Sequence, residues 1–128
     1  MRLLLDTAVF LWWVTGSEPV PGAIRKTVSA PESEVWVSAV SSWEIAVKHR
    51  LGRLPLPEAP ETLVPRERRR HGFGSLSLDE RSALHLPRLP LLHKDPFDRM
   101  LVCQAIEHGL TLVTPDHAIR KYPIRTLW

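Results

Sequence analysis

Short apolar runs that alternate with longer segments of helical spacing are the feature that most restricts the fold of this sequence. Residues 3–5, 35–37 and 110–113 are brief and apolar, as expected for strands buried inside a sheet. Segments with helical spacing lie between them. Because strands separated by helices pair in parallel and carry the helices on both faces, the order predicts an α/β fold with three layers and a mostly parallel central sheet flanked by helices.

The best-defined helix is predicted at residues 96–108, where Phe97, Leu101 and Ala105 recur at helical spacing and Gly109 follows the last turn. The region around residues 55–65 contains four prolines, at positions 55, 57, 60 and 65. They predict a helix there that is shorter or more irregular than its neighbours. The remaining expected elements are helices at 8–14, 22–30, 39–51 and 79–86, strands at 73–78 and 124–128, a loop at 86–90 and a short turn or helix at 117–121.

The chain of 128 residues has the length of one ordinary domain, and we expect a single domain over residues 1–128. Its lone cysteine, Cys103, lies among apolar residues and has no partner for an internal disulfide, which favours a buried thiol in a reducing compartment. The longest apolar stretch, residues 8–14, is far shorter than the roughly 20 residues that a membrane-spanning helix needs. With no recognisable signal peptide, these features predict a cytoplasmic protein that does not contact a membrane.

The charge of the chain is modestly positive. Its 17 lysines and arginines outnumber 14 aspartates and glutamates, which gives a formal net charge of +3. Basic residues gather in two runs, 66–71 and 48–53. Such runs are compatible with a polyanionic partner, but they are equally typical of helix faces turned to solvent.

Four acidic residues are expected at one edge of the sheet. Asp6 directly follows the first strand, Glu44 lies in the first turns of the helix after the second strand, Asp98 begins the helix at 96–108, and Asp116 follows the strand at 110–113. In open α/β sheets, ligands bind in the crevice outside the carboxyl ends of the strands. Residues far apart in sequence are thus predicted to share one rim.

Each acid also has a purely structural explanation. Carboxylates near helix starts satisfy free backbone N–H groups and interact favourably with the helix dipole. Asp95 and Asp98 fit a cap with Pro96 at the first helical position, and the stretch 41–44 fits a capping box. Asp6 can cap the helix that follows it. Helix capping therefore remains an alternative at every single site.

Taken together, the acids point to a cation. Glu44 stands among apolar residues, where a charge without a partner is unfavourable. Several carboxylates on one rim also repel each other unless a cation neutralises them. Hard divalent cations prefer oxygen ligands, and Mg²⁺ uses few protein carboxylates while leaving positions for water and phosphate. The pattern predicts a site for Mg²⁺ or Mn²⁺.

Four stretches in this order resemble the PIN-domain nucleases, and within them the ribonuclease toxins of VapC type. They are LLLDT at 3–7, VSAVSSWEIAVK at 37–48, HKDPFDRML at 93–101 and GLTLVTPD at 109–116. The resemblance covers nearly the whole chain and implies a PIN-like, Rossmann-like fold. Ala8 departs from the pattern, since relatives often carry histidine there, and so does Pro115, where a basic residue is usual.

The resemblance also implies roles for particular residues. The family's metal-binding and catalytic acids correspond to Asp6, Glu44, Asp98 and, at a more variable position, Asp116. Residues that match positions beside these ligands are Asp95, Thr114 and Thr7.

The activity implied by the resemblance is Mg²⁺- or Mn²⁺-dependent hydrolysis of RNA phosphodiester bonds by a homodimeric toxin, inhibited by a small cognate antitoxin. Two other interpretations stay open: a structure-specific nuclease acting on DNA, and an inactive domain that binds RNA or protein. Lys94 and Arg99 are candidates to bind the RNA backbone. His93, near Asp95 and Asp98, is a candidate to contact phosphate, but a loop histidine without a catalytic role is the favoured interpretation. Trp12 and Trp13 are expected to be core or dimer contacts rather than base-stacking groups.

Overall fold

A five-stranded parallel sheet forms the centre of the computed structural model, which describes residues 1–128. The strand order is β3-β2-β1-β4-β5, and every neighbouring pair is parallel. The strands are β1 (Arg2–Leu5), β2 (Glu34–Ser38), β3 (Gly74–Leu76), β4 (Thr111–Val113) and β5 (Thr126–Leu127). The predicted α/β fold with a parallel central sheet is confirmed.

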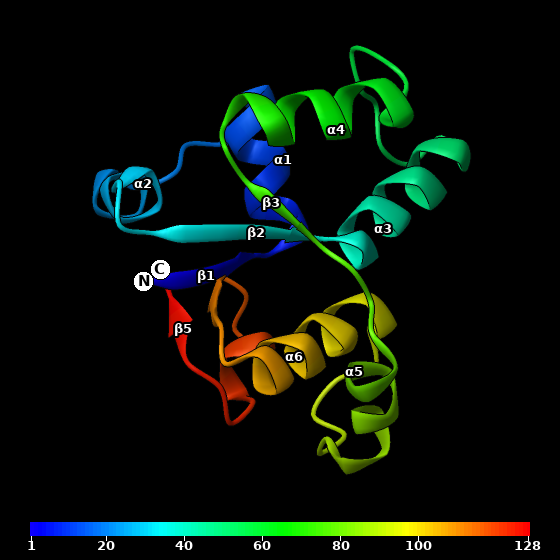
Figure 1. Ribbon diagram of the computed structural model, residues 1–128. Helices are drawn as coiled ribbons and strands as arrows, with labels where there is room; N and C mark the ends of the chain where they lie inside the picture. Colours follow the sequence, from blue (N-terminus) through cyan, green and yellow to red (C-terminus); the bar gives the residue numbers. More distant parts are fainter.

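Helices cover both faces of this sheet, with α1, α2 and α4 on one side and α5 and α6 on the other (Figure 1). The helices are α1 (Thr7–Thr15), α2 (Gly22–Ser29), α3 (Ala39–Arg50), α4 (Pro60–Arg70), α5 (Glu80–His85) and α6 (Pro96–His108), with 3₁₀ turns η1 (Leu86–Arg88) and η2 (Ile119–Lys121). Helix α6 has the predicted bounds. It ends at Gly109, whose φ of 63° is the left-handed conformation that glycine adopts without strain.

Because both faces of the sheet are covered, three consecutive residues of the first strand, Leu3, Leu4 and Leu5, are all apolar. Leu3 and Leu5 pack with α1, α2 and α4, whereas Leu4 between them packs with α6. Each of the three side chains is fully buried. Alternate residues of a strand point to opposite faces, so a sheet covered on both sides needs apolar residues without interruption.

Two local details add to the predicted pattern. Helix α4, expected to be shorter or more irregular than its neighbours, contains Pro65 and has 11 residues, against 12 in α3 and 6 in α5. The cap of α3 is Ser38, whose hydroxyl accepts a hydrogen bond from the backbone N–H of Val40, so the stretch 41–44 is not a capping box. The helix begins one turn earlier than that box requires.

The tryptophans near the start of the chain serve packing, as predicted. Trp12 meets Trp128 edge-on with ring centroids 5.9 Å apart, and Trp13 meets Phe73 at the same separation. The guanidinium of Arg25 lies 5.0 Å from the centroid of Trp13. Cys103 is fully buried, as expected for an unreactive thiol.

No helix in the structure combines the length and the apolar character needed to cross a membrane.

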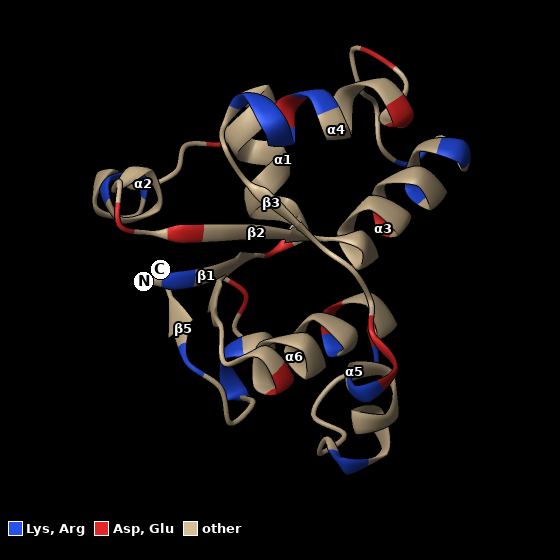
Figure 2. Cartoon of the chain, in the orientation of Figure 1, with Lys and Arg blue, Asp and Glu red and all other residues tan.

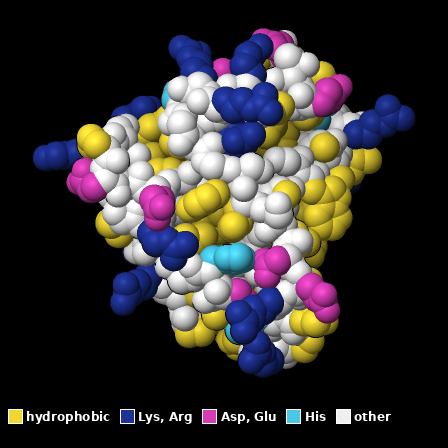
Figure 3. All heavy atoms as spheres, in the orientation of Figure 1, with side chains coloured by type: hydrophobic (Ala, Val, Ile, Leu, Met, Phe, Trp, Pro, Cys, Tyr) yellow, Lys and Arg dark blue, Asp and Glu magenta, His cyan; other side chains and the backbone are white.

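The basic run at 66–71 lies along α4, and part of its charge is neutralised by glutamates in and just before the helix. Arg66 pairs with Glu58 and Glu67, and Arg70 pairs with the same Glu67. Figure 2 shows the blue and red segments side by side on α4, and in Figure 3 dark-blue side chains gather over this helix at one end of the face. This run is a solvated helix surface with partial internal pairing.

The strand order places a crevice beside β1. The chain passes from β1 to β2 on one side, and β4 later joins on the other side. Such a reversal of strand order leaves a gap between the connections at the carboxyl ends, which is where ligands bind in folds of this kind. The loops after β1, β2 and β4 all open at this edge.

Candidate active site

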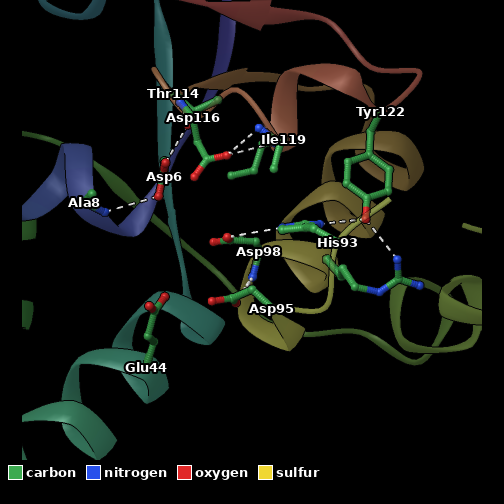
Figure 4. Close-up of polar contacts among 12 residues, drawn as sticks. Asp6, Ala8, Glu44, His93, Asp95, Asp98, Thr114, Asp116, Ile119 and Tyr122 are labelled. Carbon is green, nitrogen blue, oxygen red and sulfur yellow. Dashed lines mark hydrogen bonds and ion pairs between the residues drawn. The ribbon is translucent and has the colours of Figure 1, made fainter. Parts of the chain in front are cut away.

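The acidic residues predicted to share one rim do come together in space. Asp6 follows β1, Glu44 lies in the second turn of α3, Asp98 in the first turn of α6, and Asp116 after β4. Figure 4 shows their carboxylates facing a common space, with Asp95 beside Asp98. Four separate segments of the chain thus contribute acid groups to one crevice.

Asp6 is fixed by its neighbours on β4. Its backbone N–H donates to the carbonyl of Val113, which extends the pairing of β1 and β4 by one residue. The hydroxyl of Thr114 donates to Oδ2 of Asp6 at 2.5 Å, and the backbone N–H of Ala8 donates to Oδ1 at 3.2 Å. The carboxylate therefore caps α1 and faces the crevice at the same time, so its position is compatible with both the structural and the functional explanation.

Glu44 combines burial with an unused acceptor. Its side chain is 8% exposed, and Oε2 is paired with the ammonium of Lys48, one helical turn further along α3. Oε1 is buried and has no hydrogen-bond partner. A buried carboxylate oxygen without a donor is unfavourable unless a ligand contacts it, which is the condition that a bound cation meets.

Asp98 and Asp95 are joined by a cap. Oδ1 of Asp95 accepts a hydrogen bond of 2.9 Å from the backbone N–H of Asp98, as predicted for the start of this helix. The side chain of Asp98 is left to point into the crevice, where its Oδ2 lies 3.4 Å from Nε2 of His93. Asp95 thus positions the helix start that carries Asp98.

Asp116 is held in a turn after β4. Its Oδ1 accepts hydrogen bonds from the backbone N–H groups of Ala118 and Ile119, at 2.8 and 3.0 Å. Its own N–H donates to the hydroxyl of Thr114, the same group that donates to Asp6. Thr114 is fully buried and links the two acids on neighbouring strands.

Burial and mutual repulsion raise the pKa of two of these acids. The pKa of Asp98 rises from 3.8 to about 8, first because the carboxyl is shielded from water and then because of nearby negative charges; these belong to Asp95, Asp6, Glu44 and Asp116. Burial also raises the pKa of Asp6, against the opposing effect of its bond from Thr114. The crevice concentrates negative charge, of which only Glu44 has a lysine partner, Lys48.

The residues present fit a hard divalent cation in chemistry and charge. Carboxylates converge from four segments, and Oε1 of Glu44 is a buried acceptor with no donor. In this arrangement no three acid, imidazole or thiol groups stand close enough to enclose an ion by themselves. A site for Mg²⁺ does not require such an enclosure, because this ion keeps several waters between itself and the protein.

Thr7, predicted to lie beside the ligands, makes its hydrogen bond elsewhere. Its hydroxyl donates to Oγ of Ser41 at 2.8 Å, and both residues are buried. This bond joins the first turn of α1 to α3. Thr7 thus fixes the position of α1, which follows Asp6, relative to α3, which carries Glu44.

The structure corrects the expectation for Arg99 and adds residues that sequence reasoning missed. Arg99 is 9% exposed and its guanidinium donates to the carbonyl of Pro90 and to the hydroxyl of Tyr122, so it is not free to bind an RNA backbone. Lys48, which pairs with Glu44, was detectable as a partner from its spacing of four residues on a helix. Tyr122 carried no such signal, because only the fold brings it to the site.

Comparison with known proteins agrees with this fold. The family profile of the PIN domain matches residues 3–124. This match covers nearly all of the chain. The protein therefore belongs to the PIN domain family.

Two related proteins are ribonucleases of Mycobacterium tuberculosis. The chain is 41% identical to Ribonuclease VapC16 over 61 residues, which are 48% of this chain and 43% of that protein. It is 28% identical to Ribonuclease VapC22 over 121 residues, which are 94% of this chain and 91% of that protein. The alignment with VapC16 thus spans less than half of that relative, whereas the alignment with VapC22 is nearly complete.

Solved structures share the fold over its full length. A VapBC2 structure from Rickettsia felis, bound to a DNA fragment from its promoter, matches with a TM-score of 0.76 and 14% identity, covering 100% of this chain and 99% of that chain. A DNA-bound VapBC structure from Salmonella typhimurium matches with a TM-score of 0.71 and 19% identity, covering 99% and 97%. At these identities the likeness is one of fold.

Proposed function

We propose that this protein is a metal-dependent endoribonuclease that hydrolyses RNA phosphodiester bonds and acts as the toxin of a toxin–antitoxin pair. The observation that carries the proposal is the convergence of Asp6, Glu44 and Asp98 at the carboxyl edge of the sheet, with a raised pKa at Asp98. Membership of the PIN domain family and similarity to two proteins named as ribonucleases support the same activity.

The proposed catalytic and metal-binding residues are Asp6, Glu44 and Asp98, assisted by Asp116. These residues would hold Mg²⁺ or Mn²⁺, which would supply activation of water and compensation of negative charge for phosphodiester hydrolysis. Thr114 holds Asp6 and the turn of Asp116 in place, and the buried oxygen of Glu44 is available to the ion.

We further propose the setting of this activity. The chain forms one domain over residues 1–128, since both apolar clusters pack on the same sheet. A small cognate antitoxin is the expected partner, as the resemblance to VapC-type toxins implies; the names VapC and VapBC among the related proteins and matching structures support this. A homodimer in the cytoplasm completes the proposal. Co-purification with the product of an adjacent reading frame, followed by loss of nuclease activity in the complex, tests the partner.

Substitution of the acids tests the activity. Asp6→Asn and Asp98→Asn are assayed with single-stranded RNA and with DNA, in the presence of Mg²⁺ or Mn²⁺ and after EDTA treatment. We expect RNA cleavage to fall by more than the roughly 100-fold that is typical when a residue supporting a metal ligand is lost. Glu32→Gln is the matched control, because Glu32 is an exposed acid before β2 at the opposite edge of the sheet.

Thermal unfolding of each variant separates loss of the site from loss of the fold. Full RNA cleavage by both aspartate variants would refute the assignment of the site. Cleavage of DNA in preference to RNA would identify the second nuclease class instead, and absence of Mn²⁺ binding by calorimetry would identify a binding domain without catalysis.

A further inference from the structure

We propose that His93 is a positioning residue for Asp98, held in one tautomer by a one-way hydrogen-bond chain that starts at the buried guanidinium of Arg99 and passes through Tyr122. The proposal rests on the function assigned above, in which Asp98 is a metal-binding residue. It gives a role to a histidine that sequence analysis left as an ordinary loop residue.

The first link has a fixed direction. A guanidinium only donates hydrogen bonds. Arg99 donates to the oxygen of Tyr122 at 2.9 Å and to the carbonyl of Pro90 at 3.0 Å. Both partners are neutral oxygens, and Arg99 and Tyr122 are buried. The phenol oxygen of Tyr122 is therefore an acceptor in this bond.

The second link follows from the first. The phenol oxygen of Tyr122 has a single proton to donate, and its other hydrogen-bond neighbour is Nδ1 of His93 at 2.8 Å. Tyr122 is 3% exposed, so water is not a ready alternative acceptor. The O–H consequently donates to Nδ1. A neutral imidazole that accepts at Nδ1 carries its proton on Nε2.

The third link reaches the acid. Nε2 of His93 lies 3.4 Å from Oδ2 of Asp98, which is long for a hydrogen bond but directs an N–H at the carboxylate. The side chains of both residues are 17% exposed. In Figure 4 the second oxygen of Asp98 lies toward the space shared with Asp6 and Glu44. One oxygen is thus engaged by His93 while the other faces the crevice.

This arrangement matters because Asp98 stands among like charges. Repulsion from Asp95, Asp6 and Glu44 acts to turn its carboxyl group away from the crevice. An N–H of His93 directed at Oδ2 opposes that rotation and keeps the other oxygen toward the crevice. Partners that orient a metal-binding group in this way raise the affinity for the ion without touching it.

The tautomer of His93 is directly measurable in the metal-free protein. Long-range ¹H–¹⁵N spectra of protein with ¹⁵N-labelled histidine distinguish a proton on Nε2 from one on Nδ1, and His93→Gln assigns the signal. At about pH 8, where free imidazole is neutral, we expect the Nε2–H form in the wild type and a mixture of tautomers in Tyr122→Phe. An Nδ1–H form, or a doubly protonated ring, in the wild type overturns the chain whatever the protein's activity.

Cation binding tests the consequence. Mn²⁺ affinity is measured by electron paramagnetic resonance, and kcat and KM for RNA are measured beside it. We expect His93→Leu to weaken Mn²⁺ binding by about 10- to 100-fold and to lower kcat with little change in KM. His93→Gln, whose side-chain N–H is able to replace Nε2–H, regains most of both. His71→Leu is the matched control, since His71 is an exposed histidine at the end of α4, an element that carries none of these residues.

The outcomes separate this proposal from the assigned function. Equal defects in His93→Leu and His93→Gln indicate a merely structural histidine and overturn the positioning role. If Asp98→Asn abolishes Mn²⁺ binding while His93→Leu preserves it, the positioning role fails and the function stands. If Asp98→Asn binds Mn²⁺ as well as the wild type, the assigned function fails with it.

Discussion

Asp98 and Asp79 both lie at the start of a helix and both face a histidine, yet the fold shifts their acidity in opposite directions. Asp98 has a pKa raised to about 8, because it is shielded from water and surrounded by carboxylates. Asp79 has a pKa well below its usual value, chiefly because His108 bonds to its Oδ1 at 2.8 Å and Ser82 donates to it as well.

The two aspartates differ in whether their own fold stabilises their charge. Asp79 caps α5 and, through His108, connects α5 to the end of α6, so every contact of its charge is favourable within the protein. Asp98 begins α6 as well, but its nearest charges are repulsive. A carboxylate whose charge is unfavourable within its own fold is the better candidate for the cation proposed above.

The largest effect is expected from removing the charge of Asp98 in EDTA-treated protein. A group whose pKa is raised on folding binds its proton more tightly in the native state, so its contribution to stability is complete below the unfolded pKa of 3.8 and is lost as pH rises toward about 8. In Asp98→Asn the side chain at this position does not ionise, so the variant avoids this pH-dependent loss of stability. We expect the variant to be more stable than the wild type at about pH 8 by more than about 1.4 kcal/mol, the equivalent of one pKa unit.

Urea unfolding across this pH range measures that effect. The stability curves of Asp98→Asn and the wild type are expected to converge near pH 4 and to diverge as pH rises. Saturating Mn²⁺ reverses the order, because the ion stabilises only the protein that binds it. Parallel curves at all pH values would show that Asp98 is not strained by its neighbours.

A smaller effect of opposite sign is expected at Asp79. Asp79→Ala removes the cap of α5 and the bond to His108, and we expect it to lower the free energy of unfolding by about 1 kcal/mol. Because the pKa of Asp79 is lowered on folding, this stability is present above the unfolded pKa of 3.8 and is lost as pH falls below it.

Asp79→Asn provides the control for that prediction, since it keeps an oxygen acceptor for Ser82 while losing the charge. We expect it to retain part of the stability, and neither Asp79 variant to alter Mn²⁺ affinity. A loss of Mn²⁺ binding in Asp79→Ala would contradict the separation between the two aspartates.

Local sequence signals were enough to place the acids but not to distinguish their environments. The start of α6 was predictable because Asp95, Pro96 and Gly109 mark both ends of one helix. Asp6 was predictable because it ends an apolar run, and the register of β1 with β4 then brings it beside Thr114. Both inferences use residues that are close in sequence or a general rule of parallel sheets.

Contacts between distant segments were beyond such signals. The serines at positions 38 and 41 are equally suitable caps, and only the end of β2 decides in favour of Ser38. In the hydrogen-bond chain, Tyr122 is 23 positions from Arg99 and 29 positions from His93. No rule of sequence spacing connects residues so far apart. The opposite acidities of Asp98 and Asp79 likewise follow from tertiary neighbours, since both look like helix caps in the sequence.

Lys48 is the one cation paired with an acid of the crevice, and its removal is expected to have the smallest effect. Its ammonium bonds Oε2 of Glu44, and this bond raises the pKa of Lys48, although 43% of its side chain is exposed. Exposed pairs contribute up to about 1 kcal/mol, so Lys48→Gln changes stability little and tightens Mn²⁺ binding by at most about fivefold. Lys26→Gln, a lysine on α2, is the control. Weaker Mn²⁺ binding in Lys48→Gln alone would mean that Lys48 orients Glu44 rather than competing with the ion.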